Sequence, residues 1–240
     1  MGKLSIIISL CLITLSGVCF AQLIPNGSFE NGTIPSSTGS GETLDPATAL
    51  PGWSILGSPL YFQYGPLGGP VISLTPTTSF PASNGTNSVY LQAGFGGATN
   101  PVSLWRSLSV PLNVNAITFQ SRALYDPNLY PAGYYLPLLV SAAGLSVTPT
   151  YLSTDASGYQ TLGIDVSPYL GTSMELRFSI MLSGETWPFG GGGGAWQIDN
   201  IRYSTNPVPE PDVLTLLSVG AVMLGLQYCR KKTHARLRLP

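Results

Sequence analysis

Short segments in which apolar and polar residues alternate are the feature of this sequence that most restricts its fold. Strict alternation places every second side chain on the same face of an extended strand, so one face can be buried. The clearest examples are Ser88–Ala93, Ala116–Ser121 and Glu175–Ile180. Glycine (28 residues) and proline (21 residues) are frequent, and pairs such as Asn84-Gly85 mark turns between the segments. The pattern predicts many short strands.

Further strands are predicted where the same alternation is less regular, at Leu104–Val110, Leu136–Ala142, Leu145–Val147, Tyr159–Val166 and from Trp196 to about Tyr203. The segment Thr33–Leu50 has weak patterning and is predicted to be a long loop. Short strands at this spacing are typical of an all-β fold, an antiparallel β-sandwich or jelly roll. We therefore predict one such domain over residues 22–204.

Charged residues make up only 9% of the chain, against about 25% in ordinary soluble domains. Between Gln22 and Val208 there is no lysine, and four arginines stand against nine carboxylates, for a net charge of 4 − 9 = −5. Nucleic-acid binding needs clusters of lysine and arginine that neutralise phosphates. The acidic domain therefore argues against a nucleic-acid partner.

Cysteine and histidine are absent from the predicted domain. Cys11 and Cys19 precede it, whereas Cys229 and the only histidine, His234, follow it. A disulfide framework, a thiolate metal site and histidine-based catalysis are therefore excluded there. Nine carboxylates leave a glycoside-hydrolysing pair open, but no motif selects one. We predict a protein that is not an enzyme, with an exopolysaccharide hydrolase as the alternative.

The first 21 residues have the features of a secretory signal peptide. Lys3 gives a positive start, and an apolar stretch runs from Leu4 to Val18. Cys19 and Ala21 place small residues where a signal peptidase cleaves. We predict cleavage before Gln22 and export of the domain; the alternative is an uncleaved anchor.

The C-terminal end has the features of a membrane-spanning helix followed by a cytoplasmic tail. A linker, residues 205–212, precedes the apolar stretch Val213–Cys229, which is just long enough to cross a membrane as a helix. A basic tail, residues 230–240, follows it. Lysine and arginine flanking a membrane helix remain on the cytoplasmic side, so the domain is predicted to face outward.

The order of these C-terminal features resembles the PEP-CTERM protein-sorting signal. The residues that carry the resemblance are Val208, Pro209, Glu210, Pro211, Arg230, Lys231 and Lys232. The resemblance implies processing by an exosortase, a membrane protease of Gram-negative bacteria that make exopolysaccharide, followed by release or surface attachment. Asp212 departs from the pattern, since a small hydroxyl residue is commoner there. An ordinary tail anchor is the alternative.

A second resemblance covers most of residues 22–204. The segments Asn26–Glu30, Pro51–Trp53, Asp165–Gly171 and Trp196–Ile201 occur in an order similar to that of galactose-binding-like jelly rolls, which include carbohydrate-binding modules. The resemblance implies this fold first and sugar binding second, because a fold does not determine a function. It also implies a structural Ca²⁺ held by Glu30 and Asp199. The alternative is that Asp199 and Asn200 only hydrogen-bond to nearby turns and that Glu30 is solvated.

An aromatic, turn-rich segment is the candidate ligand-binding surface. Its residues are Tyr125, Tyr130, Tyr134 and Tyr135, and Trp187 also lies near turn residues. An aromatic ring combines an apolar face with a polar group and suits contact with a sugar ring. The alternative is that these rings pack against the ends of the sandwich.

The sequence thus predicts an exported surface or extracellular-matrix protein of a Gram-negative bacterium. Its partners would be signal peptidase, an exosortase-type protease, extracellular polysaccharide and, through the C-terminal helix, the membrane. The competing hypothesis is a structural or adhesive surface protein that has no sugar site.

Overall fold

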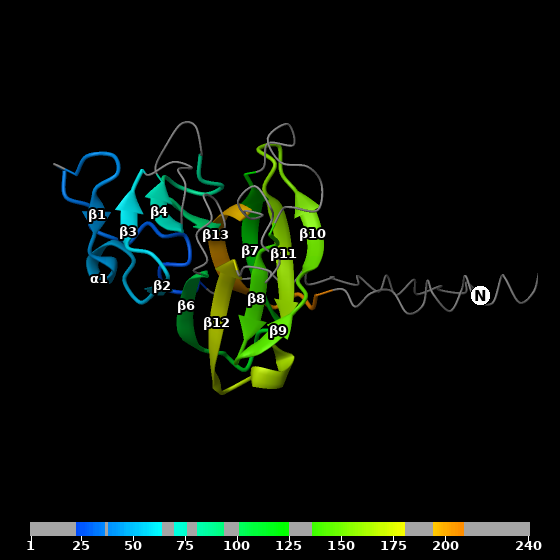
Figure 1. Cartoon of the computed structure of the whole chain (residues 1–240). Coiled ribbons are helices and arrows are strands. Elements are labelled where there is room, and N and C mark those ends of the chain that lie inside the picture. Colours follow the sequence, from blue (N-terminus) through cyan, green and yellow to red (C-terminus); the bar gives the residue numbers. More distant parts are fainter. Residues whose placement is uncertain are drawn as a thin grey trace, which may run out of the picture.

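The described part of the protein is a sandwich of two packed β-sheets (Figure 1). It comprises residues 23–36, 38–63, 70–75, 81–93, 101–124, 136–180 and 194–208 of the computed structural model. The predicted signal peptide, membrane helix and basic tail lie outside these residues and stay predictions. Within the described part of the chain, no helix has the length and hydropathy needed to cross a membrane.

The elements follow one another in the chain as β1 (Thr43–Leu44), α1 (Pro46–Ala49), β2 (Ser54–Leu56), β3 (Leu60–Phe62), β4 (Val71–Thr75), β5 (Ser88–Ala93), β6 (Val102–Ser109), β7 (Ala116–Ala123), β8 (Leu139–Ala142), β9 (Leu145–Val147), β10 (Thr150–Thr154), β11 (Gln160–Asp165), the 3₁₀ helix η2 (Ser167–Tyr169), β12 (Ser173–Ile180) and β13 (Gly194–Ser204). One sheet has eight strands in the order β1-β3-β4-β5-β13-β7-β11-β10. The other has five, in the order β2-β6-β12-β8-β9. The mostly-β sandwich predicted from the alternation is therefore confirmed.

The core lies between the sheets, because alternation directs one side of each strand inward. Along β12, Leu176, Phe178 and Ile180 are buried. The Phe178 ring lies 6.5 Å from the Trp53 ring and 5.0 Å from the Phe119 ring, measured between centroids. Since Phe119 is on β7, Phe178 joins the two sheets. Full burial of one such side chain contributes about 1.5–3 kcal/mol.

The N-terminal segment, residues 23–31, packs against β13 and carries the Asn-Gly-Ser-Phe-Glu motif. The backbone N–H of Ile201 donates to the carbonyl oxygen of Gly27 at 2.8 Å. A Cβ at Gly27 would lie 2.0 Å from the carbonyl oxygen of Ile201, so only glycine fits there. Phe29 is buried, with its ring centroid 5.5 Å from that of Trp53. The motifs Asn26–Glu30, Pro51–Trp53 and Trp196–Ile201 thus meet in one structural assembly.

Two features differ from the prediction. The segment Thr33–Leu50 is not wholly a loop, because it contains β1 and α1. Asp45 caps α1, its side chain accepting a hydrogen bond from the backbone N–H of Ala47.

The sheet pairing is also not purely antiparallel, since β3 and β4 pair in parallel. All other strand pairs of the described residues are antiparallel.

Candidate functional site

Most of the site residues predicted from the sequence lie outside the described residues, and their roles stay predictions. They are Tyr125, Tyr130, Tyr134, Tyr135 and Trp187 of the aromatic surface, and Pro209, Glu210, Pro211, Arg230, Lys231 and Lys232 of the sorting signal. The structure does place Glu30, Asp199 and Val208.

Glu30 holds one end of the loop formed by residues 81–87. Its Oε1 accepts hydrogen bonds from the backbone N–H groups of Thr86 and Asn87, at 2.7 and 2.6 Å. Its Oε2 accepts from Nδ2 of Asn87 at 3.0 Å. The carboxylate therefore connects the N-terminal segment to the start of β5.

Asp199 holds the other end of this loop from β13. Its Oδ2 accepts from the backbone N–H groups of Ser83 and Asn84, at 2.8 and 2.9 Å, and from Oγ of Ser83 at 3.1 Å. Its Oδ1 accepts from the N–H of Asn200 at 2.6 Å. Burial raises the pKa of Asp199 to about 6, although the hydrogen bonds from Asn84, Asn200 and Ser83 act in the opposite direction.

These contacts do not fit the calcium site that the resemblance implied. A calcium ion needs six to eight oxygen ligands whose lone pairs face the metal. Here the carboxylate oxygens of Glu30 and Asp199 face backbone N–H donors, whose positive ends would repel a cation. Among the described residues there is no group of three His, Cys, Asp or Glu that could hold a metal ion. The structure thus matches the alternative for Asp199, which hydrogen-bonds to a nearby turn. Glu30 differs from the alternative, because it accepts hydrogen bonds from Thr86 and Asn87 rather than being solvated.

A polar network lies on the outer face of the eight-stranded sheet. Arg122 of β7 donates from Nη2 and Nε to Oε1 of Gln197 at 2.5 and 3.2 Å. Nε2 of Gln197 donates to Oγ of Ser88 at 2.9 Å. The Arg122 guanidinium also lies 4.8 Å from the ring centroid of Tyr159, whose hydroxyl donates to the carbonyl oxygen of Pro81. Burial raises the pKa of Tyr159 to about 12. Because Gln197, Ser88 and Tyr159 are buried, this network joins strands and is not a ligand surface.

Two shallow grooves, of about 520 and 400 Å³, lie beside the segment that leaves β13. Pro207 and Val208 line both of them. Gly163 of β11 leaves room for Val208, since a Cβ there would lie 3.0 Å from Cγ2 of Val208. The first residue of the predicted sorting motif therefore packs against the domain.

The outer face of the five-stranded sheet carries a continuous polar row across all five strands. Directly paired residues share one face of a sheet. Ser54 pairs with Trp105, Trp105 with Arg177, Arg177 with Ser141, and Ser141 with Ser146. Trp105 and Arg177 are partly exposed, and Ser54 and Ser146 are exposed. This row brings serine hydroxyls, the Arg177 guanidinium and the Trp105 indole together on one accessible face of the described structure.

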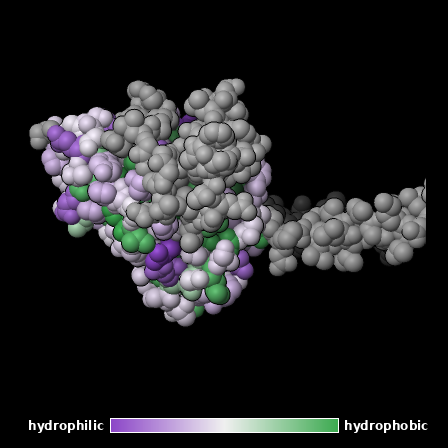
Figure 2. Space-filling view, viewed as in Figure 1, coloured by the Kyte–Doolittle hydropathy of each residue, from purple (hydrophilic) through white to green (hydrophobic). Residues whose placement is uncertain are grey.

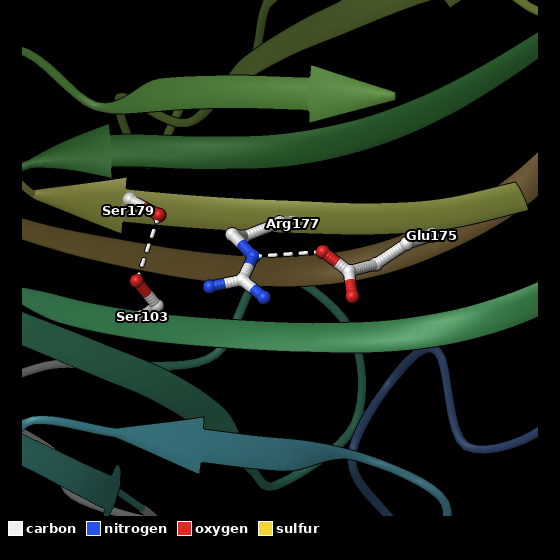
Figure 3. Close-up of polar contacts among 4 residues, drawn as sticks. All are labelled: Ser103, Glu175, Arg177 and Ser179. Atoms are coloured by element: carbon white, nitrogen blue, oxygen red, sulfur yellow. Dashed lines mark hydrogen bonds and ion pairs between the residues drawn. The ribbon is translucent and has the colours of Figure 1, made fainter. Parts of the chain in front are cut away.

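Arg177 is fixed in place within this row. Its Nε donates to Oε1 of Glu175 at 2.8 Å, and its guanidinium lies 4.5 Å from the Trp105 ring centroid. The side chains of Arg177 and Glu175 are 30% and 34% exposed, so both can reach a ligand. Beside them, the hydroxyls of Ser103 and Ser179 are 2.8 Å apart (Figure 3). Figure 2 shows a small, strongly hydrophilic patch over β6 and β12 with hydrophobic residues beside it; other hydrophilic patches lie toward the edges of this view.

This site was missed by the sequence analysis. One part of it is visible in the sequence, because Ser173, Glu175, Arg177 and Ser179 alternate with apolar residues. In the segment Ser103–Ser109 the alternation is interrupted by Arg106. The pairing of these strands is a contact between distant parts of the chain, and alternation within each strand cannot reveal it.

Comparisons with known proteins give only distant likenesses. No protein-family model matches the sequence, and no curated protein matches it. Among solved structures, the apo form of a cyclase from Fischerella sp. is similar, with a TM-score of 0.46 and 15% identity, covering 80% of this chain and 98% of that one. TmCBM61, in complex with β-1,4-galactotriose, has a TM-score of 0.40 and 13% identity over 76% of this chain and 97% of that one. A family 11 carbohydrate-binding module from Clostridium thermocellum, in complex with a mixed-linked tetrasaccharide, has a TM-score of 0.34 and 13% identity, covering 70% and 96%.

Proposed function

We propose that this chain is an exported cell-surface or extracellular-matrix protein whose β-sandwich binds polysaccharide without catalysis. The signal-peptide features of residues 1–21 and the sorting-signal features from Val208 to Lys232 support export and processing. The domain stays outside the cytoplasm, where extracellular polysaccharide is its most abundant neighbour in an exopolysaccharide-producing cell.

The observation that carries the binding proposal is the polar row on the five-stranded sheet. Sugar polymers present many hydroxyl groups and few apolar surfaces, so they are bound by side chains that donate and accept hydrogen bonds beside an aromatic ring. The row supplies serine hydroxyls, the Arg177–Glu175 pair and the partly exposed indole of Trp105. Strands of a packed sandwich hold these groups in fixed positions, which lowers the entropic cost of binding.

Binding without hydrolysis follows from the charges on this face. Glycoside hydrolysis uses two carboxyl groups, one on each side of the scissile bond. Glu175 is the only carboxylate that the described strands direct outward from the five-stranded sheet. Its Oε1 is also engaged by Nε of Arg177 at 2.8 Å.

Affinity electrophoresis of the protein through gels that contain single soluble polysaccharides tests this function. Retardation by at least one polysaccharide is expected, and substitution Trp105→Ala should weaken it because the indole supports Arg177. Leu112→Ala is the matched control, since Leu112 is an exposed apolar residue away from the row. Failure to bind any polysaccharide would favour the structural or adhesive hypothesis.

A further inference from the structure

We infer that the polymer bound by the five-stranded sheet is a neutral polysaccharide, recognised by the Arg177–Glu175 pair acting as a joint donor and acceptor. This inference rests on the proposed function and specifies its ligand class. Its evidence is the contact between Arg177 and Glu175 on the outer face of β12 (Figure 3) and the position of the Arg177 guanidinium over the ring of Trp105 on β6.

One edge of the Arg177 fork is already occupied, and the charge of the guanidinium is already paired. An arginine binds a carboxylate best through two parallel N–H groups of its planar fork. On Arg177, the Nε–H is already donated to Oε1 of Glu175 at 2.8 Å. A carboxylate on the ligand would therefore approach a guanidinium whose charge is neutralised, and it would meet the negative charge of Glu175 at short range.

The other hydrogen-bonding groups of Arg177 and Glu175 are suited to sugar hydroxyls rather than to a carboxylate. Among the described residues, neither Nη of Arg177 has a hydrogen-bond acceptor and Oε2 of Glu175 has no donor. The pair thus offers donors and an acceptor side by side at the surface. A sugar hydroxyl both donates and accepts, so two neighbouring hydroxyls can accept from Arg177 and donate to Glu175 together. Hydrogen bonds to charged groups are stronger than those between neutral groups.

The surroundings of the pair agree with a neutral ligand. No other charged side chain points outward from the described strands of this sheet, where serines predominate. The segment between Gln22 and Val208 carries a net charge of −5, which repels a polyanion at long range. A neutral polymer meets no such repulsion.

The row also indicates how the polymer would lie on the sheet. Its paired residues cross five neighbouring strands from Ser54 to Ser146. Since neighbouring strands are about 4.8 Å apart, the row extends over about 19 Å. Leu56 and Leu139 flank the buried hydroxyls of Ser103 and Ser179 in the adjacent row. A chain of several sugar residues lying across the strands would contact the whole row.

The test compares matched neutral and carboxylated polymers by affinity electrophoresis and isothermal titration calorimetry. The probes are hydroxyethylcellulose with carboxymethylcellulose, together with neutral galactan, xylan, mannan and dextran, and carboxylated alginate and polygalacturonate. We expect binding to at least one neutral polymer, weaker binding to carboxylated polymers, and an affinity that changes little with salt. A charge-driven interaction would instead weaken steeply as salt increases.

Conservative variants assign the binding to the pair. Arg177→Gln and Glu175→Gln should each lower the affinity for the neutral polymer about tenfold, as expected for one charged hydrogen bond of about 1.4 kcal/mol. Arg202→Gln, on the eight-stranded sheet, is the matched control and should leave the affinity unchanged. Thermal unfolding of each variant shows whether the fold is retained, and glutamine keeps the shape of both side chains closely enough to expect this.

The outcomes separate the two proposals. Tighter, salt-sensitive binding to a carboxylated polymer, lost in Arg177→Gln, would overturn the neutral-ligand inference and leave polysaccharide binding intact. Neutral binding that neither variant weakens would overturn the assignment to this pair. Absence of binding to every polymer would overturn the proposed function itself.

Discussion

Asp199 combines complete burial with several hydrogen bonds, and this combination makes the stability of the protein depend on pH. Its pKa is about 6 in the folded protein, raised by burial from the ordinary value of 3.8. The folded state therefore holds a proton that the unfolded state releases between these values. The stabilisation is fully present below pH 3.8 and is lost as the pH rises through about 6.

The first prediction is that acidification stabilises the protein through Asp199. Lowering the pH from about 7 to about 5 should raise the free energy of unfolding by about 1 kcal/mol from this group alone. Urea unfolding followed by tryptophan fluorescence at each pH measures it. Asp199→Asn should remove this contribution, whereas Asp165→Asn, at an exposed turn, should retain it. An identical pH dependence in Asp199→Asn and the wild type would show that Asp199 is not its source.

The second prediction concerns calcium. The oxygens of Glu30 and Asp199 are occupied by N–H donors, so Ca²⁺ should leave the melting temperature unchanged. A specific site at about 100 times its dissociation constant would add about 2.7 kcal/mol, which is a shift of several degrees for a domain of this size. Calorimetry in Ca²⁺ and in EDTA distinguishes the two cases. A lower melting temperature in EDTA would contradict the structural role given to these carboxylates.

The elements show which parts of the fold can be predicted from sequence. Strands whose sequence alternates between apolar and polar residues, such as β5, β9 and β12, were predicted with correct or nearly correct bounds. Strand β4, Val71–Thr75, was missed because the adjacent apolar residues Val71 and Ile72 interrupt the alternation. Very short strands such as β1 and β2 carry too few residues to show a period.

The candidate site could be predicted only in part, for a related reason. The motifs singled out Glu30 and Asp199, but as calcium ligands; their hydrogen bonds to residues 83–87 could not be predicted. Arg177 and Trp105 are 72 positions apart in the chain and become neighbours only when β6 pairs with β12. A single sequence contains no signal for such a pairing.

The third prediction addresses how the N-terminal segment joins β13. Gly27→Ala would place a methyl group 2.0 Å from the carbonyl oxygen of Ile201. Because the blocked atom belongs to the backbone of a strand, relief requires the segment to move. We expect a loss of about 3 kcal/mol in the free energy of unfolding, at the upper end of the range for overpacking. Chemical denaturation measures this.

Gly39→Ala is the matched control for that substitution. A Cβ there would meet only the flexible side chain of Glu42, at 3.3 Å from Oε1. Its effect should stay within about 0.5 kcal/mol, the usual range for surface substitutions. Equal losses in the two variants would mean that the contact between Gly27 and Ile201 does not hold the segment in place.

At the scale of the whole molecule, the folded domain extends to the first residue of the predicted sorting motif. The backbone N–H of Asn206 donates to Oγ of Ser204, and Nδ2 of Asn115 donates to the carbonyl oxygen of Thr205. Val208 then packs near Gly163 of β11. Only four residues, 209–212, separate Val208 from the apolar stretch Val213–Cys229. A processing protease would therefore have to cleave beside the domain surface.

The fourth prediction is the mass of the mature protein. Val208 is packed, so cleavage before it would require the end of the domain to detach. We expect intact-mass spectrometry of the protein, recovered from the cell surface or the medium of an exosortase-containing Gram-negative bacterium, to place the N-terminus at Gln22 and the C-terminus between Val208 and Asp212. Substitution of Arg230, Lys231 and Lys232 by glutamine should cause the unprocessed form to accumulate, because these cations hold the tail in the cytoplasm. Glutamine in place of Arg236 and Arg238, farther along the tail, is the control. Recovery of a chain from Met1 to Pro240 in the cytosol would contradict export, and with it the access of the Arg177–Glu175 pair to any extracellular polysaccharide.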